Sequence, residues 1–202
     1  MVPATPRRDP VVSPRAVQLA IVVASLVMLA GLLLPGFRTW RQHAAEQVAR
    51  RQLESIRDGI LQFMADTGLP PTRARNGDPR GLFRLLGPGL IAEGTYYFAD
   101  RHQGSLVEQL AENTPQGRRQ PGYEGWRGPY VRALTADPWG FAVVVVVYPL
   151  AHADDRDCVI VSAGPNGRMD ATYSSPRDVI AAGDDVVVLV ADKSPLARSP
   201  LK

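Results

Sequence analysis

Cysteine is almost absent from this 202-residue chain, which has a single thiol at Cys158. One cysteine cannot form an internal disulfide, and no cluster of cysteine and histidine has the spacing of a zinc site. Cys158 opens an apolar run, so we expect it to be a small buried residue of the core. Histidine is also scarce. His43, His102 and His152 lie far apart in polar contexts, and we expect all three to be exposed.

Strong net charge and catalytic motifs are lacking as well. The chain has 23 basic and 20 acidic residues, a formal net charge of +3, and no basic run with interleaved aromatics, so nothing in it indicates nucleic-acid binding. No nucleophile elbow, phosphate-binding loop, zinc-protease motif or dinucleotide fingerprint occurs. An EF-hand loop is also missing. The sequence therefore predicts a protein that is not an enzyme.

Long hydrophobic runs are limited to one segment near the N-terminus. Residues 16–35 carry no charge, and only Gln18 and Ser25 among them are polar. About 20 apolar residues of helix span a bilayer core. A cleavable signal peptide, the competing interpretation, has a shorter apolar core that is followed by a small-x-small cleavage site. The residues that begin at Phe37 are not such a site, so we expect a retained membrane helix.

This run divides the chain into four predicted parts. Residues 1–15 contain four prolines and no periodicity, so we expect a disordered leader. We expect residues 16–37 to form a transmembrane helix and residues 38–192 to form a folded domain. Residues 193–202 are rich in proline, serine and basic residues, which predicts a disordered tail. Basic residues ahead of the run favour a cytoplasmic N-terminus.

The hydrophobic pattern predicts how the domain begins. Apolar residues recur at three- or four-residue steps from Ala45 to Met64, and polar residues fill the other faces. This is typical of an amphipathic helix with one buried stripe, here continuous with the membrane helix. The helix should end at Gly68, which two prolines soon follow.

Shorter patterns predict the rest of the domain. Residues 82–86 and 106–110 have helical spacing. Residues 141–148, 158–162 and 186–190 are rich in β-branched side chains and are expected to be strands, the first two forming a hairpin. The predicted fold class is therefore α+β, with a long N-terminal helix packed on a small antiparallel β-sheet.

Several segments resemble one family, and they follow in the same order. LQFMADTGLPPT (residues 61–72) is similar to the helix end of type II secretion pseudopilins. The other segments resemble the major, G-type pseudopilin: GWRGPYV (125–131), DPWG (137–140), VSAGPNG (161–167) and GDDVVVLV (183–190). The resemblance covers about residues 14–190 and implies a pseudopilin-like fold.

Two of these motifs also have a structural interpretation. In the DPWG segment, proline fixes φ, glycine permits a reversal of the chain, and Trp139 supplies packing surface, which is turn chemistry ahead of a strand. Trp126, Pro129 and Tyr130 are expected to anchor an irregular loop on the sheet. Neither motif requires catalysis.

The N-terminus departs from the prepilin pattern. Family members have a glycine, a cleavage junction, and then an apolar helix with glutamate at its fifth position. Aligning a family proline with Pro35 places the junction between Ser13 and Pro14 and places Gln18 at the glutamate position. We therefore expect the leader to remain uncleaved. Without cleavage there is no free amine to neutralise inside lipid, where an unpaired charge is costly. The alternative is that Gln18 is only a polar residue near the membrane interface.

The C-terminal loop contains the candidate metal site. Calcium prefers hard oxygen ligands from carboxylates, amides and carbonyls. The family that this chain resembles binds calcium in this loop, which implies a Ca²⁺ site formed by Ser162, Asn166, Asp170, Asp184 and Asp185. The alternative is a polar surface loop that favours Asn and Asp for their turn chemistry.

The resemblance also implies location and function. The protein would be a single-pass protein of the bacterial inner membrane with its domain in the periplasm. It would serve as a structural subunit of a type II secretion pseudopilus that helps to export folded proteins. Its partners would be other pseudopilins, inner-membrane components of the secretion system and membrane lipid, with no nucleic acid. The alternative function is a membrane-anchored periplasmic interaction module that does not polymerise.

Overall fold

The structure is a computed structural model that describes residues 14–74, 81–95, 102–115, 117, 121–151, 158–173, 179–180 and 182–190. Within these ranges, the side chains at positions 14, 16–17, 20, 30–39, 151, 172–173 and 179–180 are not described. Residues 1–13 of the predicted leader and the whole predicted tail lie outside the described residues, as does His152. The chain divides into two compact units, Met1–His43 and Ala44–Lys202.

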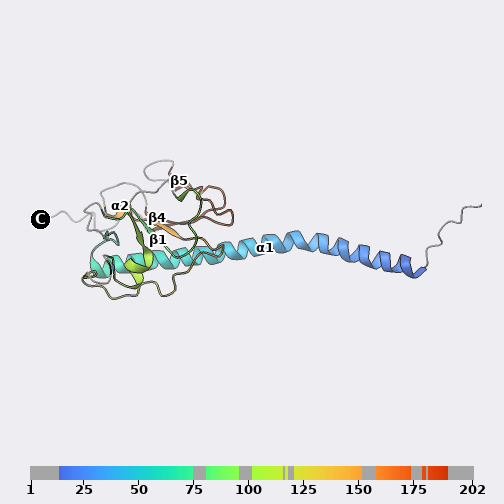
Figure 1. The fold of residues 1–202 in the computed structure, drawn as a ribbon, viewed down its shortest axis with the longest axis horizontal. Helices are drawn as coiled ribbons and strands as arrows, with labels where there is room; N and C mark the ends of the chain where they lie inside the picture. The colour runs from blue at the N-terminus through green and yellow to red at the C-terminus, as the bar shows by residue number, and fades with distance from the viewer. Residues whose placement is uncertain are drawn as a thin grey trace, which may run out of the picture. The chain divides into compact units, whose positions relative to one another are not determined.

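The first unit contains the beginning of helix α1, which comprises the 54 residues Pro14–Thr67 (Figure 1). In this unit the described large apolar side chains are more than half exposed. The hydroxyl of Ser25 donates a hydrogen bond to the Ile21 carbonyl at 2.8 Å, so this polar group is satisfied within the helix itself. The exposed apolar residues are Leu19, Ile21, Val22, Val23, Leu26, Val27, Met28, Leu29 and Trp40.

The second unit contains the rest of α1, which is amphipathic as predicted. The buried stripe comprises Ala49, Leu53, Ile56, Ile60, Phe63 and Met64. The helix ends where the sequence predicts. Gly68 adopts a φ of 68°, a left-handed conformation that glycine accepts without strain, and its N–H donates to the Met64 carbonyl at 2.9 Å.

A five-stranded sheet covers the buried stripe of α1. Its strands are β1 (Arg84–Leu86), β2 (Gln103–Ser105), β3 (Val144–Val146), β4 (Cys158–Ser162) and β7 (Val186–Val190), in the order β2-β1-β3-β4-β7. A separate two-stranded sheet pairs β5 (Thr172–Tyr173) with β6 (Val179–Ile180). Two short helical segments, η2 (Val107–Ala111) and α2 (Tyr148–Ala151), complete the described elements.

The three predicted strands are confirmed, and β3 and β4 pair antiparallel as expected. Two other predictions are wrong. The sheet is mixed rather than antiparallel, because β1 and β2 run parallel. Residues 82–86 contain strand β1 (Arg84–Leu86) rather than a helix, because β2 and β3 pair with this segment on either side. The helical pattern at 106–110 is confirmed as η2, which has the wider π geometry.

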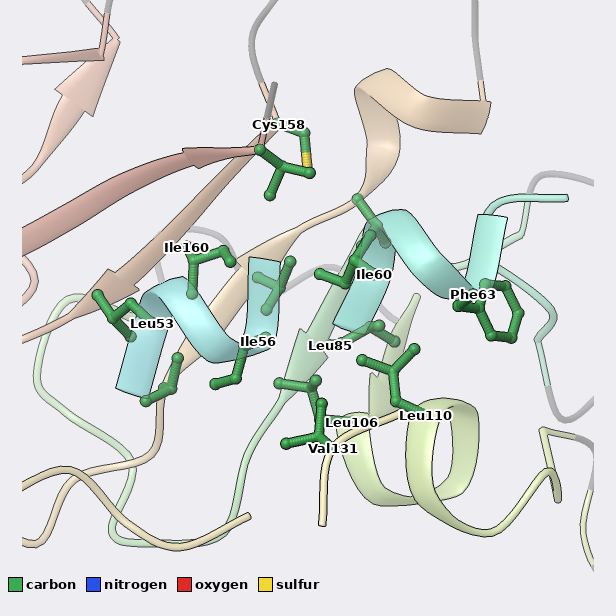
Figure 2. Close-up of a cluster of buried hydrophobic side chains, with 14 of the residues drawn as sticks. Leu53, Ile56, Ile60, Phe63, Leu85, Leu106, Leu110, Val131, Cys158 and Ile160 are labelled. Atoms are coloured by element: carbon green, nitrogen blue, oxygen red, sulfur yellow. The ribbon is translucent and has the colours of Figure 1, made fainter. Parts of the chain in front are cut away.

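The core lies between α1 and the sheet (Figure 2). Leu53, Ile56, Ile60 and Phe63 from the helix are at most 1% exposed. Burying side chains of this size contributes about 1.5–3 kcal/mol each. Cys158 belongs to the same cluster, which confirms its role as a small buried residue.

The GWRGPYV segment packs against the core and contacts the C-terminal part of α1. The Tyr130 ring lies 5.5 Å from the Phe63 ring, and the Tyr130 hydroxyl donates to Asp66 at 3.0 Å. Gly59 makes this close approach possible. A Cβ atom at Gly59 would lie 2.7 Å from the Val131 Cγ2 atom and 3.0 Å from the Tyr130 carbonyl oxygen.

Histidine exposure was predicted correctly at one described position and wrongly at the other. His43 is exposed on α1. His102 is only 6% exposed, and its ring lies 4.7 Å from the Phe83 ring. The polar residues around His102 gave no sign of this contact. Phe83 approaches His102 only because β1 and β2 pair in parallel.

Candidate functional site

Sheet topology brings the two ends of the C-terminal loop together. Strands β4 and β7 are antiparallel neighbours, and their register places Ser162 opposite Val186. Residues 163–185 therefore leave the sheet and return to it at adjacent points. This explains how Asn166 and Asp170 come close to Asp184 and Asp185 despite their separation in sequence.

Two adjacent aspartates hold the loop through its backbone. One carboxylate oxygen of Asp185, Oδ2, accepts the N–H groups of Asp170 at 2.8 Å and Ala171 at 2.6 Å. The Oδ2 atom of Asp184 accepts the N–H of Asn166 at 3.0 Å. Hydrogen bonds from backbone amides to a carboxylate are charge-assisted and comparatively strong. These contacts hold residues 166–171 of the loop to the Asp184–Asp185 pair.

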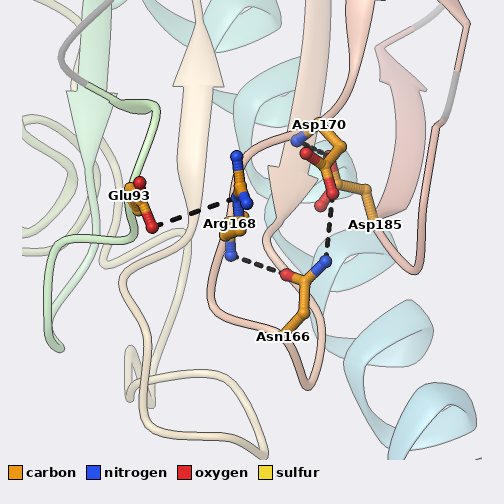
Figure 3. A network of polar contacts seen from close by, with 5 residues as sticks. All are labelled: Glu93, Asn166, Arg168, Asp170 and Asp185. Carbon is orange, nitrogen blue, oxygen red and sulfur yellow. Dashed lines mark hydrogen bonds and ion pairs between the residues drawn. The ribbon is translucent and has the colours of Figure 1, made fainter.

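Side-chain contacts link the remaining predicted ligands (Figure 3). The Asn166 Nδ2 group donates to Asp170 Oδ2 at 3.0 Å, and Asn166 Oδ1 accepts the N–H of Arg168 at 2.6 Å. Four of the five predicted calcium ligands, Asn166, Asp170, Asp184 and Asp185, therefore form one polar network.

Electrostatics disfavour charge on one member of this network. The pKa of Asp185 is raised from 3.8 to about 6, chiefly by burial and also by the neighbouring carboxylates of Asp170 and Asp184, against the lowering effect of the two backbone hydrogen bonds. The Oδ1 atoms of Asp184 and Asp185 are buried and find no hydrogen-bond partner within the described residues. Buried carboxylate oxygens of this kind are suited to a hard cation.

Ser162, the fifth predicted ligand, makes a different contact. It is fully buried, and its hydroxyl donates to Asp137 Oδ2 at 2.6 Å. Asp137 was not predicted as part of the site, because its place in the DPWG segment indicated only a turn. The carboxylate directly before Pro138 was the one feature in the sequence that could have drawn attention to Asp137. No local pattern connects it to a serine 25 residues later.

A second segment absent from the prediction lies beside the loop. The N–H of Glu93 donates to the Gly167 carbonyl at 2.9 Å, and the N–H of Met169 donates to the Glu93 carbonyl at 2.7 Å. The side chains of Arg168 and Glu93 approach to 3.9 Å, but both are largely exposed (Figure 3). A surface pair of this kind contributes little. The backbone bonds therefore account for most of the contact.

The donor chemistry of the loop suits calcium, whereas a converged ligand cluster is not found. In the described part of the chain, no group of three or more histidine, cysteine, aspartate or glutamate side chains is arranged to hold a metal ion. Asp170 Oδ2 already accepts a hydrogen bond from Asn166. A cation bound to the buried Oδ1 atoms of Asp184 and Asp185 would break no described hydrogen bond.

The predicted processing residues lie at the start of α1. Ser13 lies outside the described residues, and Pro14 is the first residue of the helix. Gln18 is exposed one turn later. Proline suits the first turn of a helix because the N–H that it lacks would have no partner there.

Comparison with protein-family models, with curated proteins and with solved structures gives no match for this chain. Among the residues that the structure describes, no helix is long and apolar enough to cross a membrane. Membership of the pseudopilin family therefore stays a prediction from the sequence motifs.

Proposed function

We propose that this protein is a structural, pseudopilin-like subunit of a type II secretion pseudopilus. The observation that carries the proposal is the exposed apolar surface of α1 in the first unit. The eight large apolar side chains from Leu19 to Leu29 are each 51–74% exposed. Exposed apolar surface of this extent marks an interaction site.

The sequence around these side chains favours lipid and neighbouring helices as the covering partners. Residues 16–35 contain no charge over a length that suits a bilayer core. Packing between such helices in lipid depends on van der Waals contact and on small residues that allow close approach. Once assembled, the helices would hold the periplasmic domains in an array that helps to move folded proteins across the outer membrane.

The domain contributes a surface rather than a reaction under this proposal. Two of its sequence motifs have structural roles. GWRGPYV contacts the C-terminal part of α1, and DPWG forms a hydrogen-bonded turn. The loop of residues 163–185 would bind one calcium ion, with Asp184 and Asp185 supplying most of the affinity. The buried Oδ1 atoms of these two residues support that part of the proposal.

Assembly is tested with the full chain in bacterial membranes. Extraction of the membranes at alkaline pH should leave the protein with the lipid. Ultracentrifugation after mild detergent treatment should then pellet it as an oligomer. Val27→Glu, which places a charge among the exposed apolar side chains, should abolish pelleting, whereas Gln47→Glu on an exposed part of α1 in the second unit should not. A wild-type protein that is released by alkali, or that never pellets, would contradict the proposal.

Calcium binding is tested separately by calorimetric titration of the full chain in detergent micelles. A ligand that binds only the folded state stabilises it by about 2.7 kcal/mol when its free concentration is about 100 times Kd. Asp184→Ala combined with Asp185→Ala should abolish the binding heat. Asp58→Ala, which removes an exposed carboxylate from α1, should not. Magnesium should substitute poorly because it requires a tighter octahedral site. Absence of binding to the wild type would refute the calcium site.

The second candidate function is a membrane-anchored interaction module that does not polymerise. The departures from the prepilin pattern at Ser13, Pro14 and Gln18 favour it. Such a module would stay with the membrane at alkaline pH but would behave as a monomer in mild detergent. Intact-mass measurement after co-expression with a prepilin peptidase addresses the same question, because a mature chain that begins at Pro14 would show that the leader is removed.

A further inference from the structure

Asp137 is a buried carboxylate at the meeting point of three chain segments. Only 5% of the residue is exposed. Its Oδ1 atom accepts the N–H groups of Trp139 at 3.0 Å and Phe141 at 2.8 Å, and its own N–H donates to the Phe141 carbonyl at 2.9 Å. These bonds close the turn that leads into β3.

The other oxygen of Asp137 reaches a different part of the chain. Its Oδ2 atom accepts the Ser162 hydroxyl at 2.6 Å, and Ser162 is the last residue of β4. Hydrogen bonds to an ionised carboxylate are about twice as strong as neutral ones. The bond therefore fixes the point at which residues 163–185 leave the sheet.

The same turn also supports the loop further along. The Phe141 ring lies directly against Gly167, where it fills the space that a Cβ atom would need. Leu90 pairs with the turn through its N–H to the Gly140 carbonyl at 3.0 Å and through its carbonyl to the Ala142 N–H at 2.8 Å. Glu93, three residues later, holds the loop through the two backbone bonds described above.

We propose that Asp137 is the positioning residue of the loop that carries the candidate calcium ligands, and that Ser162 serves Asp137 rather than the cation. The role of Asp137 in calcium binding rests on the proposed calcium site. Its effect on the position of the loop does not depend on calcium. We assign Asp137 to positioning rather than to ligation because it is only 5% exposed and its described hydrogen bonds all go to the turn and to Ser162. Asp137 closes the turn on which residues 90–93 pair, and it binds the residue at which the loop begins. Its loss therefore loosens the loop without removing a calcium ligand.

The first test is hydrogen exchange of the full chain in detergent micelles with a chelator present. Ser162→Ala removes the 2.6 Å bond. The amides of Glu93 and Met169 should then exchange about tenfold faster or more, as expected for a lost bond to a charged group. The Tyr130 amide, which donates to the Leu110 carbonyl at 2.9 Å in another part of the domain, should be unaffected.

Tyr123→Phe provides a matched control. It also removes a buried hydroxyl bond of 2.6 Å, in this case to Gln109. Its effect should appear at the amide of Arg73, which donates to the Tyr123 hydroxyl at 2.9 Å, and not at Glu93. Equal acceleration at Glu93 by both substitutions would indicate general destabilisation and would overturn the inference. Unchanged exchange at Glu93 in Ser162→Ala would do the same.

The second test uses calcium titration to separate positioning from ligation. Asp137→Asn keeps a carbonyl oxygen for the turn amides but replaces the acceptor of the Ser162 hydroxyl with an amide donor. Asp137→Asn and Ser162→Ala should weaken calcium binding by similar factors, and the double variant should be no weaker than either. If Ser162→Ala weakens binding and Asp137→Asn does not, Ser162 is a ligand and the inference is wrong. If the wild type binds no calcium, the calcium proposal fails, and the exchange experiment still decides whether Asp137 positions the loop.

Discussion

Replacing Asp185 with asparagine is expected to remove a pH-dependent part of the stability of the domain. Burial and the neighbouring carboxylates raise the pKa of Asp185 from 3.8 to about 6 in the folded protein. The folded state therefore holds a proton more tightly than the unfolded state. Below the unfolded pKa this stabilisation is fully present, and it is lost as the pH rises through the folded pKa. Stability should fall between about pH 4 and about pH 6 when calcium is absent.

The size of the effect follows from the pKa difference. Each pKa unit corresponds to about 1.4 kcal/mol, which gives about 3 kcal/mol for a fully buried carboxyl. Asp185 is only partly buried, and solvent screening reduces that value to about 1 kcal/mol. An asparagine at this position would have no proton to lose, while its carbonyl oxygen could still accept the N–H groups of Asp170 and Ala171.

Urea unfolding with a chelator present measures this difference. The free energy of unfolding is compared at about pH 4.5 and about pH 7.5 for the wild type and for Asp185→Asn. Other groups titrate in both proteins, so the quantity of interest is the difference between the two pH slopes. The wild type should lose about 1 kcal/mol more than the variant as the pH rises. Identical slopes would show that Asp185 titrates normally and would refute the assigned electrostatics.

Three further predictions concern the packing of α1. Gly59→Leu should lower the free energy of unfolding by about 1–3 kcal/mol, because Val131 occupies the space at Gly59; Ser55→Leu on the exposed side should change it by less than about 0.5 kcal/mol in the same urea titration. Phe63→Ala should cost about 3–5 kcal/mol, and a urea midpoint close to that of the wild type would contradict the core assignment. A fragment of residues 44–202 should unfold cooperatively by calorimetry, because the described core lies within this unit; a broad transition without a peak would count against a self-contained domain.

Regular elements were predictable wherever one local pattern determined the structure. The bounds of β4 and β7 match the predicted strands, because uninterrupted β-branched runs rarely suit any other element. The end of α1 at Thr67 was predictable from Gly68, which supplies the left-handed conformation. Both cases depend on short-range stereochemistry alone.

Local patterns do not reveal contacts that depend on distant segments. Residues 82–86 have helical spacing, yet β1 is a strand because β2 and β3 pair with it on either side. The calcium prediction placed Ser162 among the ligands by its position in a motif. The structure directs its hydroxyl to Asp137, and no local pattern contains that contact. In both cases, the deciding neighbour lies far away along the chain.

The pairing of Ser162 with Val186 also determines where this protein can change in length. Both ends of the intervening loop are fixed in adjacent strands, so residues added between β5 and β6 would leave the register of the five-stranded sheet unchanged. Doubling the length of a flexible loop costs only about 0.6 kcal/mol in closure entropy. An affinity tag or a fluorescent domain inserted there would keep α1 and its core intact, and natural variants could lengthen the same segment to acquire a new recognition surface.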